Sequence, residues 1–75
     1  MNEFLEKLKE IRPDIDFEVE DALIDDGLLA SFDILRIVAM IEEEYEVKVP
    51  VKELKPANFN SAEALFALVE RLEDE

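Results

Sequence analysis

The chain contains no cysteine and no histidine. Disulfides, zinc sites built from thiolates or imidazoles, and nucleophiles activated by histidine are therefore excluded together. Tryptophan is also absent, and glycine occurs once. No apolar run approaches the length of a membrane span, and no secretory-type segment opens the sequence. We therefore expect a cytoplasmic protein without membrane insertion.

Positive charge is scarce: eight Lys and Arg residues face 21 Asp and Glu residues, a formal net charge of −13 at pH 7. Such a chain is repelled by phosphate backbones and anionic lipids, which excludes nucleic acid and favours basic protein surfaces as partners. The charge also repels itself, so moderate salt should stabilise the fold. With 75 residues, 49% of them apolar, we expect one monomeric domain, residues 1–75, with one small core.

Apolar periodicity predicts three main helices and one short helical turn. The main helices cover Asn2 to Ile11, Ser31 to Tyr45, and a segment after Asn60, which we expect to be the N-cap of a capping box. The short turn is expected at Val51 to Leu54, before Pro56 interrupts it. The fold class is therefore all-α.

Residues 13–30 show no helical stripe. A strand over Ile15 to Val19 is an alternative, because apolar residues alternate there with a period of two, but a lone strand lacks a strong partner. We favour a long loop fastened to the core by its apolar side chains, and loops of this length are often functional. These side chains are Ile15, Phe17, Val19, Leu23, Ile24, Leu28 and Leu29.

The helix beginning at Ser31 is expected to have two faces. The core-facing stripe contains Leu35, Val38, Ile41 and Tyr45, and it is widened by Ile34 and Ile37. The solvent face carries Phe32, Arg36, Ala39 and Glu43. An exposed aromatic such as Phe32 suits a docking anchor for a partner, and a hydrophobe that covers the loop is the alternative.

Ser31 follows a glycine-containing loop and opens a predicted helix. Unpaired amides and the positive end of the helix dipole favour a phosphoryl group at that place. No residue in the adjacent sequence can activate the hydroxyl as a nucleophile, so another enzyme would have to modify it. The simpler alternative is a serine that only caps the helix.

Three stretches of the chain together form a known pattern. The segments Gly27-Leu28-Leu29-Ala30-Ser31-Phe32, Ile41-Glu42-Glu43-Glu44-Tyr45 and Val49-Pro50 resemble the acyl carrier protein family. The Val-Pro-Val connector and the stretch from Glu53-Leu54 to Asn60-Ser61 are more similar to D-alanyl carrier proteins and peptidyl carrier domains. The resemblance implies an antiparallel four-helix bundle, with three longer helices and one short one. It also implies a 4'-phosphopantetheine arm, derived from coenzyme A, on Ser31.

On that arm the resemblance implies an aminoacyl group, D-alanyl for example, or an acyl group, held as a thioester. The implied partners are a phosphopantetheinyl transferase, an adenylating ligase or other loading enzyme, and a downstream acyltransferase. They are expected to dock on the second helix. The candidate docking residues are Phe32, Asp33, Arg36, Ala39 and Glu43. No catalytic residue and no metal ligand is expected, so the chain itself is not an enzyme.

Two positions depart from the family pattern. The family usually has Asp where this chain has Ala30, and Ala as N-cap costs about 0.5–2 kcal/mol unless Ser31 itself caps. Slow priming, a dedicated transferase and loss of priming therefore stay open. Arg36 stands where many members have an acid, and an ion pair with Asp33 or a contact with a partner are equal alternatives.

Three other functions are alternatives to a carrier protein. An acidic interaction module with the same fold and no arm is supported by Ala30. A calcium-binding loop from Asp14 to Asp26 has many carboxylates but lacks the spacing of an EF-hand. An independent enzyme is disfavoured because a chain of this size leaves little room for a substrate cleft.

Overall fold

The computed structural model describes residues 2–74, which form an all-helical fold. Its elements are α1 (Asn2–Ile11), α2 (Ser31–Tyr45), the short 3-10 turn η1 (Val51–Glu53), α3 (Pro56–Phe59) and α4 (Ala62–Glu73). The predicted main helices are confirmed. No strand forms within residues 2–74, and the segment from residue 13 to residue 30 is a loop made of turns.

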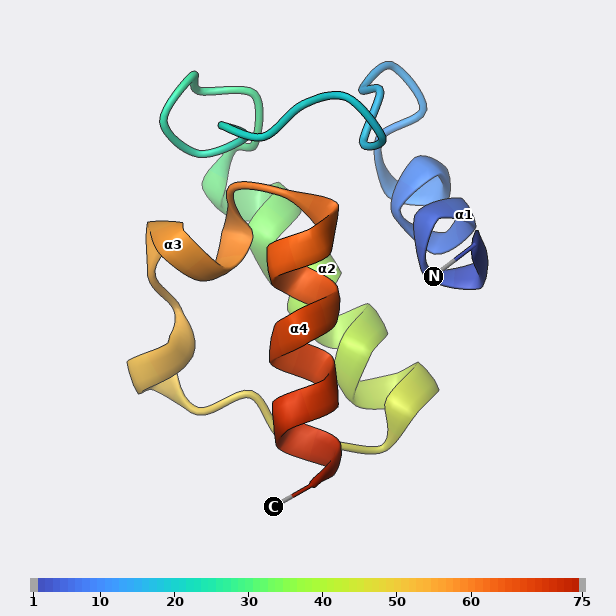
Figure 1. Ribbon diagram of the computed structural model, residues 1–75, viewed down its shortest axis with the longest axis vertical. Coiled ribbons are helices and arrows are strands. Elements are labelled where there is room, and N and C mark those ends of the chain that lie inside the picture. Colours follow the sequence, from blue (N-terminus) through green and yellow to red (C-terminus); the bar gives the residue numbers. More distant parts are fainter. Residues whose placement is uncertain (1, 75) are drawn as a thin grey trace.

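The directions of the helices differ in part from the prediction. α1 runs opposite to α2, against which it packs, whereas α2 and α4 run in roughly the same direction (Figure 1). The bundle is therefore not antiparallel throughout. The connection from Glu46 to Ser61 explains this arrangement, because it runs back along the length of α2 before α4 begins. The 15 residues of α2 span about 22 Å at 1.5 Å per residue. η1 and α3 lie on this return path.

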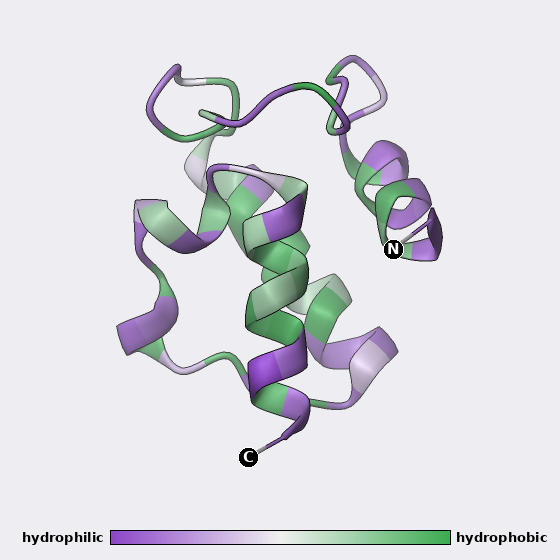
Figure 2. Ribbon diagram, in the orientation of Figure 1, coloured by the Kyte–Doolittle hydropathy of each residue, from purple (hydrophilic) through white to green (hydrophobic). Residues whose placement is uncertain are grey.

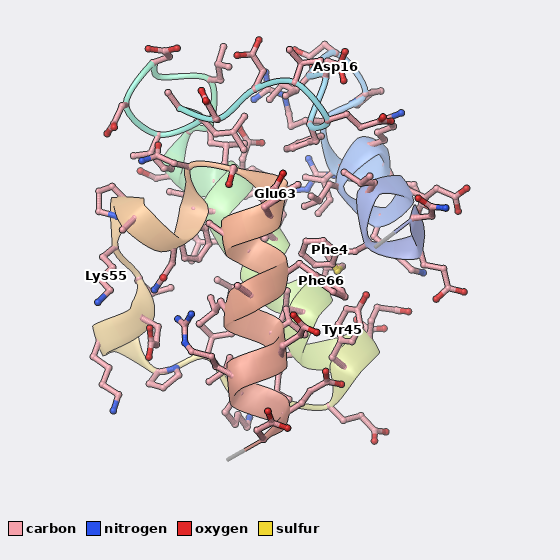
Figure 3. The ribbon with its side chains drawn as sticks, viewed as in Figure 1. Phe4, Asp16, Tyr45, Lys55, Glu63 and Phe66 are labelled. Carbon is pink, nitrogen blue, oxygen red and sulfur yellow. The ribbon has the colours of Figure 1, made fainter. Side chains whose placement is uncertain are left out.

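The core lies where α1, α2 and α4 meet. Its fully buried side chains include Phe4, Leu8, Leu23, Ile37, Ile41, Phe59, Leu65, Leu68 and Val69. Figure 2 shows hydrophobic residues along the middle of α4 and hydrophilic residues toward its carboxyl end. The ring of Phe4 lies with its centroid 6.0 Å from that of Tyr45 and 5.5 Å from that of Phe66 (Figure 3). These aromatic contacts hold α1 against the other two helices.

Two apolar residues predicted to reach the core do not. Leu35 is 63% exposed and Val19 is 72% exposed. In α2 the buried positions are Ile37 and Ile41, one turn apart. Since Leu35 precedes Ile37 by two residues, it is rotated by about 200° from it at 3.6 residues per turn and points out of the core.

Pro56 begins a helix, whereas the sequence pattern indicated only an interruption. It occupies the first turn of α3, where the amide that proline lacks would have no helical partner. The short helix buries Asn58 and Phe59 and packs against α4. The fold therefore contains a second short helical element after the predicted turn at η1.

α4 begins one residue later than predicted, because Ser61 and not Asn60 is its N-cap. The Ser61 hydroxyl accepts a 3.0 Å hydrogen bond from the amide three residues on. The Asn60 side-chain oxygen instead accepts from the amides of Ile24 and Asp25, at 3.0 and 3.1 Å. The backbone carbonyl of Asn60 accepts from the Leu23 amide at 2.8 Å. Asn60 therefore fastens the 13–30 loop to the start of α4.

Candidate attachment site at Ser31

Ser31 is the first residue of α2, and Ala30 occupies the N-cap position. Ala30 has extended backbone angles, φ −87° and ψ 166°, and its side chain forms no cap hydrogen bond. The hypothesis that Ser31 itself caps the helix is therefore wrong. Its side chain is exposed at the end of the helix, so the hydroxyl is accessible to another protein.

The loop before Ser31 folds tightly onto itself. The amides of Leu28 and Leu29 both donate to the carbonyl of Leu23, at 2.9 and 3.1 Å. Between them and Leu23, Gly27 adopts a left-handed conformation with φ +71°, which glycine reaches without strain. This compact turn fixes the direction in which the chain enters α2.

Arg12 joins three parts of the chain at this place. Its Nη1 donates to the Asp33 carboxylate at 2.6 Å and to the carbonyl of Leu28 at 3.0 Å. Its Nε and Nη2 donate to Asp14 at 2.9 and 2.8 Å. The Asp33 carboxylate also accepts from the Ala30 amide at 3.0 Å, which supplies half of a capping box. The guanidinium thus connects the end of α1, the loop and the first turn of α2.

The charges of this network are stabilised by one another. The hydrogen bond from the Ala30 amide lowers the pKa of Asp33, burial opposes that shift, and Arg12 reinforces it. The hydrogen bond from Arg12 lowers the pKa of Asp14 to about 2. In return, Asp14 and then Asp33 raise the pKa of Arg12. All three groups are therefore ionised at neutral pH.

The structure corrects the expected place of Asp33. Only 6% of this residue is exposed, and its carboxylate is held by Arg12. It therefore does not lie on the docking face with the other candidates. The ion pair between Asp33 and Arg36, one of the two alternatives for Arg36, is also not formed among the described residues.

The other candidate docking residues lie on one exposed face of α2. Phe32 is 69% exposed, which disfavours the alternative that it covers the loop. Arg36, Ala39 and Glu43 are exposed as well. The predicted solvent face is confirmed as a surface, whereas its contact with partners stays a prediction.

A groove of about 350 Å³ lies beside Ser31, between α2 and the segment from Leu54 to Phe59, which includes α3. Its lining consists of Ile24, Ser31, Ile34, Leu35, Leu54, Lys55, Pro56 and Phe59. Figure 3 shows Lys55 on the side of η1 and α3. The volume falls in the range of small-molecule pockets. The sequence pattern does not predict this groove. The one residue that hints at it is Leu35, an apolar residue that the helix does not bury.

No three Asp or Glu side chains among residues 2–74 gather closely enough to hold a metal ion. The calcium-loop hypothesis therefore gains no geometric support. Within the same residues, none of the helices combines the length and apolar character needed to cross a bilayer.

The chain is similar over most of its length to a D-alanyl carrier protein from Lactobacillus helveticus (strain DPC 4571). The two are 27% identical over 62 residues, which cover 83% of this chain and 78% of the relative. The similarity supports the carrier protein family. No protein-family model and no solved structure matches the chain. The family to which the motif around Ser31 pointed is thus supported by a comparison that extends well beyond that motif.

Proposed function

We propose that this chain is a carrier protein whose Ser31 bears a 4'-phosphopantetheine arm. The observation that carries the proposal is the exposed Ser31 hydroxyl at the start of α2, which does not cap the helix and lies at the edge of an apolar groove. The similarity to a D-alanyl carrier protein supports the same function. Single-domain organisation and a cytoplasmic location stay predictions.

The residues around Ser31 fit a covalently attached phosphodiester. In priming, a bond forms between the Ser31 oxygen and the phosphorus of coenzyme A that bears the pantetheine. The bond from that phosphorus to the bridging oxygen breaks, adenosine 3',5'-bisphosphate leaves, and the hydroxyl proton passes to a base of the transferase. The chain has no histidine or cysteine for this chemistry. When bound, the arm supplies the thiol that carries the acyl group.

The chain's own contribution is to hold Ser31 in place and favour the new negative charge. Amides of the first turn of α2 and the positive end of its dipole stabilise an anion there. The hydrogen bonds that the Asp33 carboxylate accepts from Arg12 and from the Ala30 amide hold the same turn in place. The chain on this proposal binds and presents its cargo and is not an enzyme.

The outer face of α2 is proposed as the docking face. Phe32 supplies a large apolar anchor beside the attachment site, and Arg36, Ala39 and Glu43 continue the same exposed face. The transferase, the loading ligase and the acyltransferase would each contact this face in turn. The net charge of −13 favours partners that present basic surfaces.

An unmodified interaction module with the same docking face is the second candidate. Ala30 favours it, because the N-cap position has no carboxylate to support arm transfer. This candidate predicts binding to partners without any change of mass.

The deciding experiment is intact mass spectrometry after incubation with coenzyme A and a promiscuous phosphopantetheinyl transferase. The chain contains only two serines, Ser31 and Ser61. We expect one phosphopantetheine on the wild type and on Ser61→Ala, and none on Ser31→Ala. A wild-type mass that stays unchanged with every competent transferase, including one from the host, would exclude the carrier function.

A further inference from the structure

The lining of the Ser31 groove is unusual for this chain. Within residues 2–74 the lining consists of six apolar residues, Ser31 and Lys55, and none of these side chains is a carboxylate. The chain as a whole carries 21 acidic and eight basic residues. A groove whose described lining has a lysine as its one charged residue therefore stands out in a chain with so many acids.

Lys55 also lacks the neutralising neighbour that several other cations have. Among residues 2–74 it forms no ion pair, whereas Lys7, for example, pairs with Glu44 at 3.1 Å. The acid closest to Lys55 in sequence is Glu53. Its carboxylate accepts from Nδ2 of the Asn58 side chain at 2.9 Å and pairs with Arg71 at 3.4 Å. The positive charge of Lys55 is thus left for another anion.

We propose that Lys55 sets the cargo class of this groove, so that a loaded acyl group ending in a carboxylate is favoured over one bearing an ammonium group. This inference rests on the proposed function. The hydrocarbon part of the cargo contacts apolar side chains such as Leu35 and Phe59, which removes apolar surface from water. A carboxylate at its end would lie near Lys55, the charged residue of the described lining.

An aminoacyl cargo fits this groove poorly. Its ammonium group would lose water against apolar side chains and would lie near the like charge of Lys55. Among the described lining residues, no carboxylate is present to pair with it. The name of the similar protein from Lactobacillus helveticus indicates a D-alanyl cargo for that protein. The groove of this chain indicates a different cargo class, a dicarboxylic acid joined through one of its carboxyl groups.

The test uses the unprimed chain, so it does not depend on modification of Ser31. Three hydrolysis-resistant pantetheine amides, carrying a succinyl, a butyryl or a 4-aminobutyryl group, are titrated while the backbone amide signals of Leu35, Leu54 and Lys55 are followed by NMR. All three cargoes have four carbons and differ in terminal charge. We expect the succinyl compound to bind roughly two- to fivefold more tightly than the butyryl compound, as an exposed ion pair allows. The 4-aminobutyryl compound should bind most weakly.

Matched variants assign the preference to one residue. Lys55→Gln should lower the affinity for the succinyl compound to that for the butyryl compound. Lys48→Gln makes the same change of net charge outside the groove and should leave the order intact. Equal or tighter binding of the 4-aminobutyryl compound, equal effects of the two variants, or no shift of the groove signals would overturn the proposal. Failure of priming with the succinyl preference intact would instead contradict the carrier function alone.

Discussion

The Asp33 carboxylate lies 2.6 Å from Nη1 of Arg12, although 21 positions separate the two residues in the chain. Asp33 is buried in the first turn of α2, and Arg12 directly follows α1. One contact therefore fixes the start of the helix that carries Ser31 relative to the end of α1.

This contact predicts a pH-dependent contribution of Asp33 to stability. Asp33→Asn should lower the free energy of unfolding at pH 7 by about 1–3 kcal/mol, because a charged hydrogen bond to Arg12 is lost. The pKa of Asp33 is lower in the folded chain than its ordinary value of 3.8. Its stabilisation is therefore complete above that value and is lost as the pH falls through the lower, folded pKa.

Urea unfolding of both proteins between pH 7 and pH 3 measures this effect, because other acids titrate equally in both and cancel in the difference. The difference should stay constant near neutral pH and shrink in acid. Asp26→Asn, the same change at an exposed acid of the 13–30 loop, serves as the control. A difference that does not depend on pH would show that Asp33 contributes by packing alone.

Ala30→Asp should strengthen the start of α2. The backbone of Ala30 already has the extended conformation of an N-cap residue, so a carboxylate placed there is expected to add about 0.5–2 kcal/mol. If that carboxylate also assists arm transfer, priming should become faster. Ala30→Asn caps without a charge, so it separates the two effects: equal stability with slower priming than the Asp variant supports a role of the charge. Equal priming of all three proteins would refute that role.

Asn60→Ala and Ser61→Ala should weaken different parts of the fold despite being neighbours. The first removes the acceptor for the Ile24 and Asp25 amides, and the second removes the cap of α4, worth typically about 1 kcal/mol. Hydrogen exchange should accelerate at Ile24 and Asp25 in the first variant. In the second it should accelerate in the first turn of α4. The same exchange pattern in both would contradict the separate roles.

Arg36→Glu tests the outer face of α2. Arg36 is exposed and forms no ion pair among the described residues, so its reversal should change stability by no more than about 0.5 kcal/mol. Loading by the cognate ligase should nevertheless fall. Lys48→Glu carries the same change of charge away from α2 and should load normally. A shift of the melting temperature with unchanged loading would assign Arg36 a structural role only.

Added salt should raise the melting temperature from its value at very low ionic strength. The net charge of −13 produces a repulsion that salt screens over about 10 Å at 0.1 M. Calorimetry in sodium chloride from 10 mM to 300 mM measures the change. A melting temperature that falls with salt would mean that the ion pairs, such as Lys7 with Glu44, outweigh the repulsion.

The sequence predicts those parts of the fold that depend on local pattern. α1 and α2 follow from apolar residues at helical spacing and from Pro13, and the exposed position of Phe32 follows from its place on the helix. Ser31 is identified by the motif that its neighbours form. These features need only residues within a few turns of one another.

Features that depend on residues distant in the chain could not be read in this way. Nothing near Arg12 in the sequence indicates its hydrogen bond to Asp33. Asn60 is predicted as a cap, but its side-chain oxygen accepts from the 13–30 loop instead. Periodicity predicts Leu35 in the core because it does not distinguish a buried face from the wall of a groove. The groove itself requires α2 and α3 to lie together, which no local spacing encodes.

The shared direction of α2 and α4 has an electrostatic consequence. Both helices begin at the end of the molecule crossed by the 13–30 loop (Figure 1), and that loop carries seven acids: Asp14, Asp16, Glu18, Glu20, Asp21, Asp25 and Asp26. The amino-terminal ends of α2 and α4, which are partly positive, therefore face the most negative stretch of the chain. This arrangement reduces mutual repulsion within the stretch, and a further anion esterified to Ser31 would enter a field already moderated by two helices.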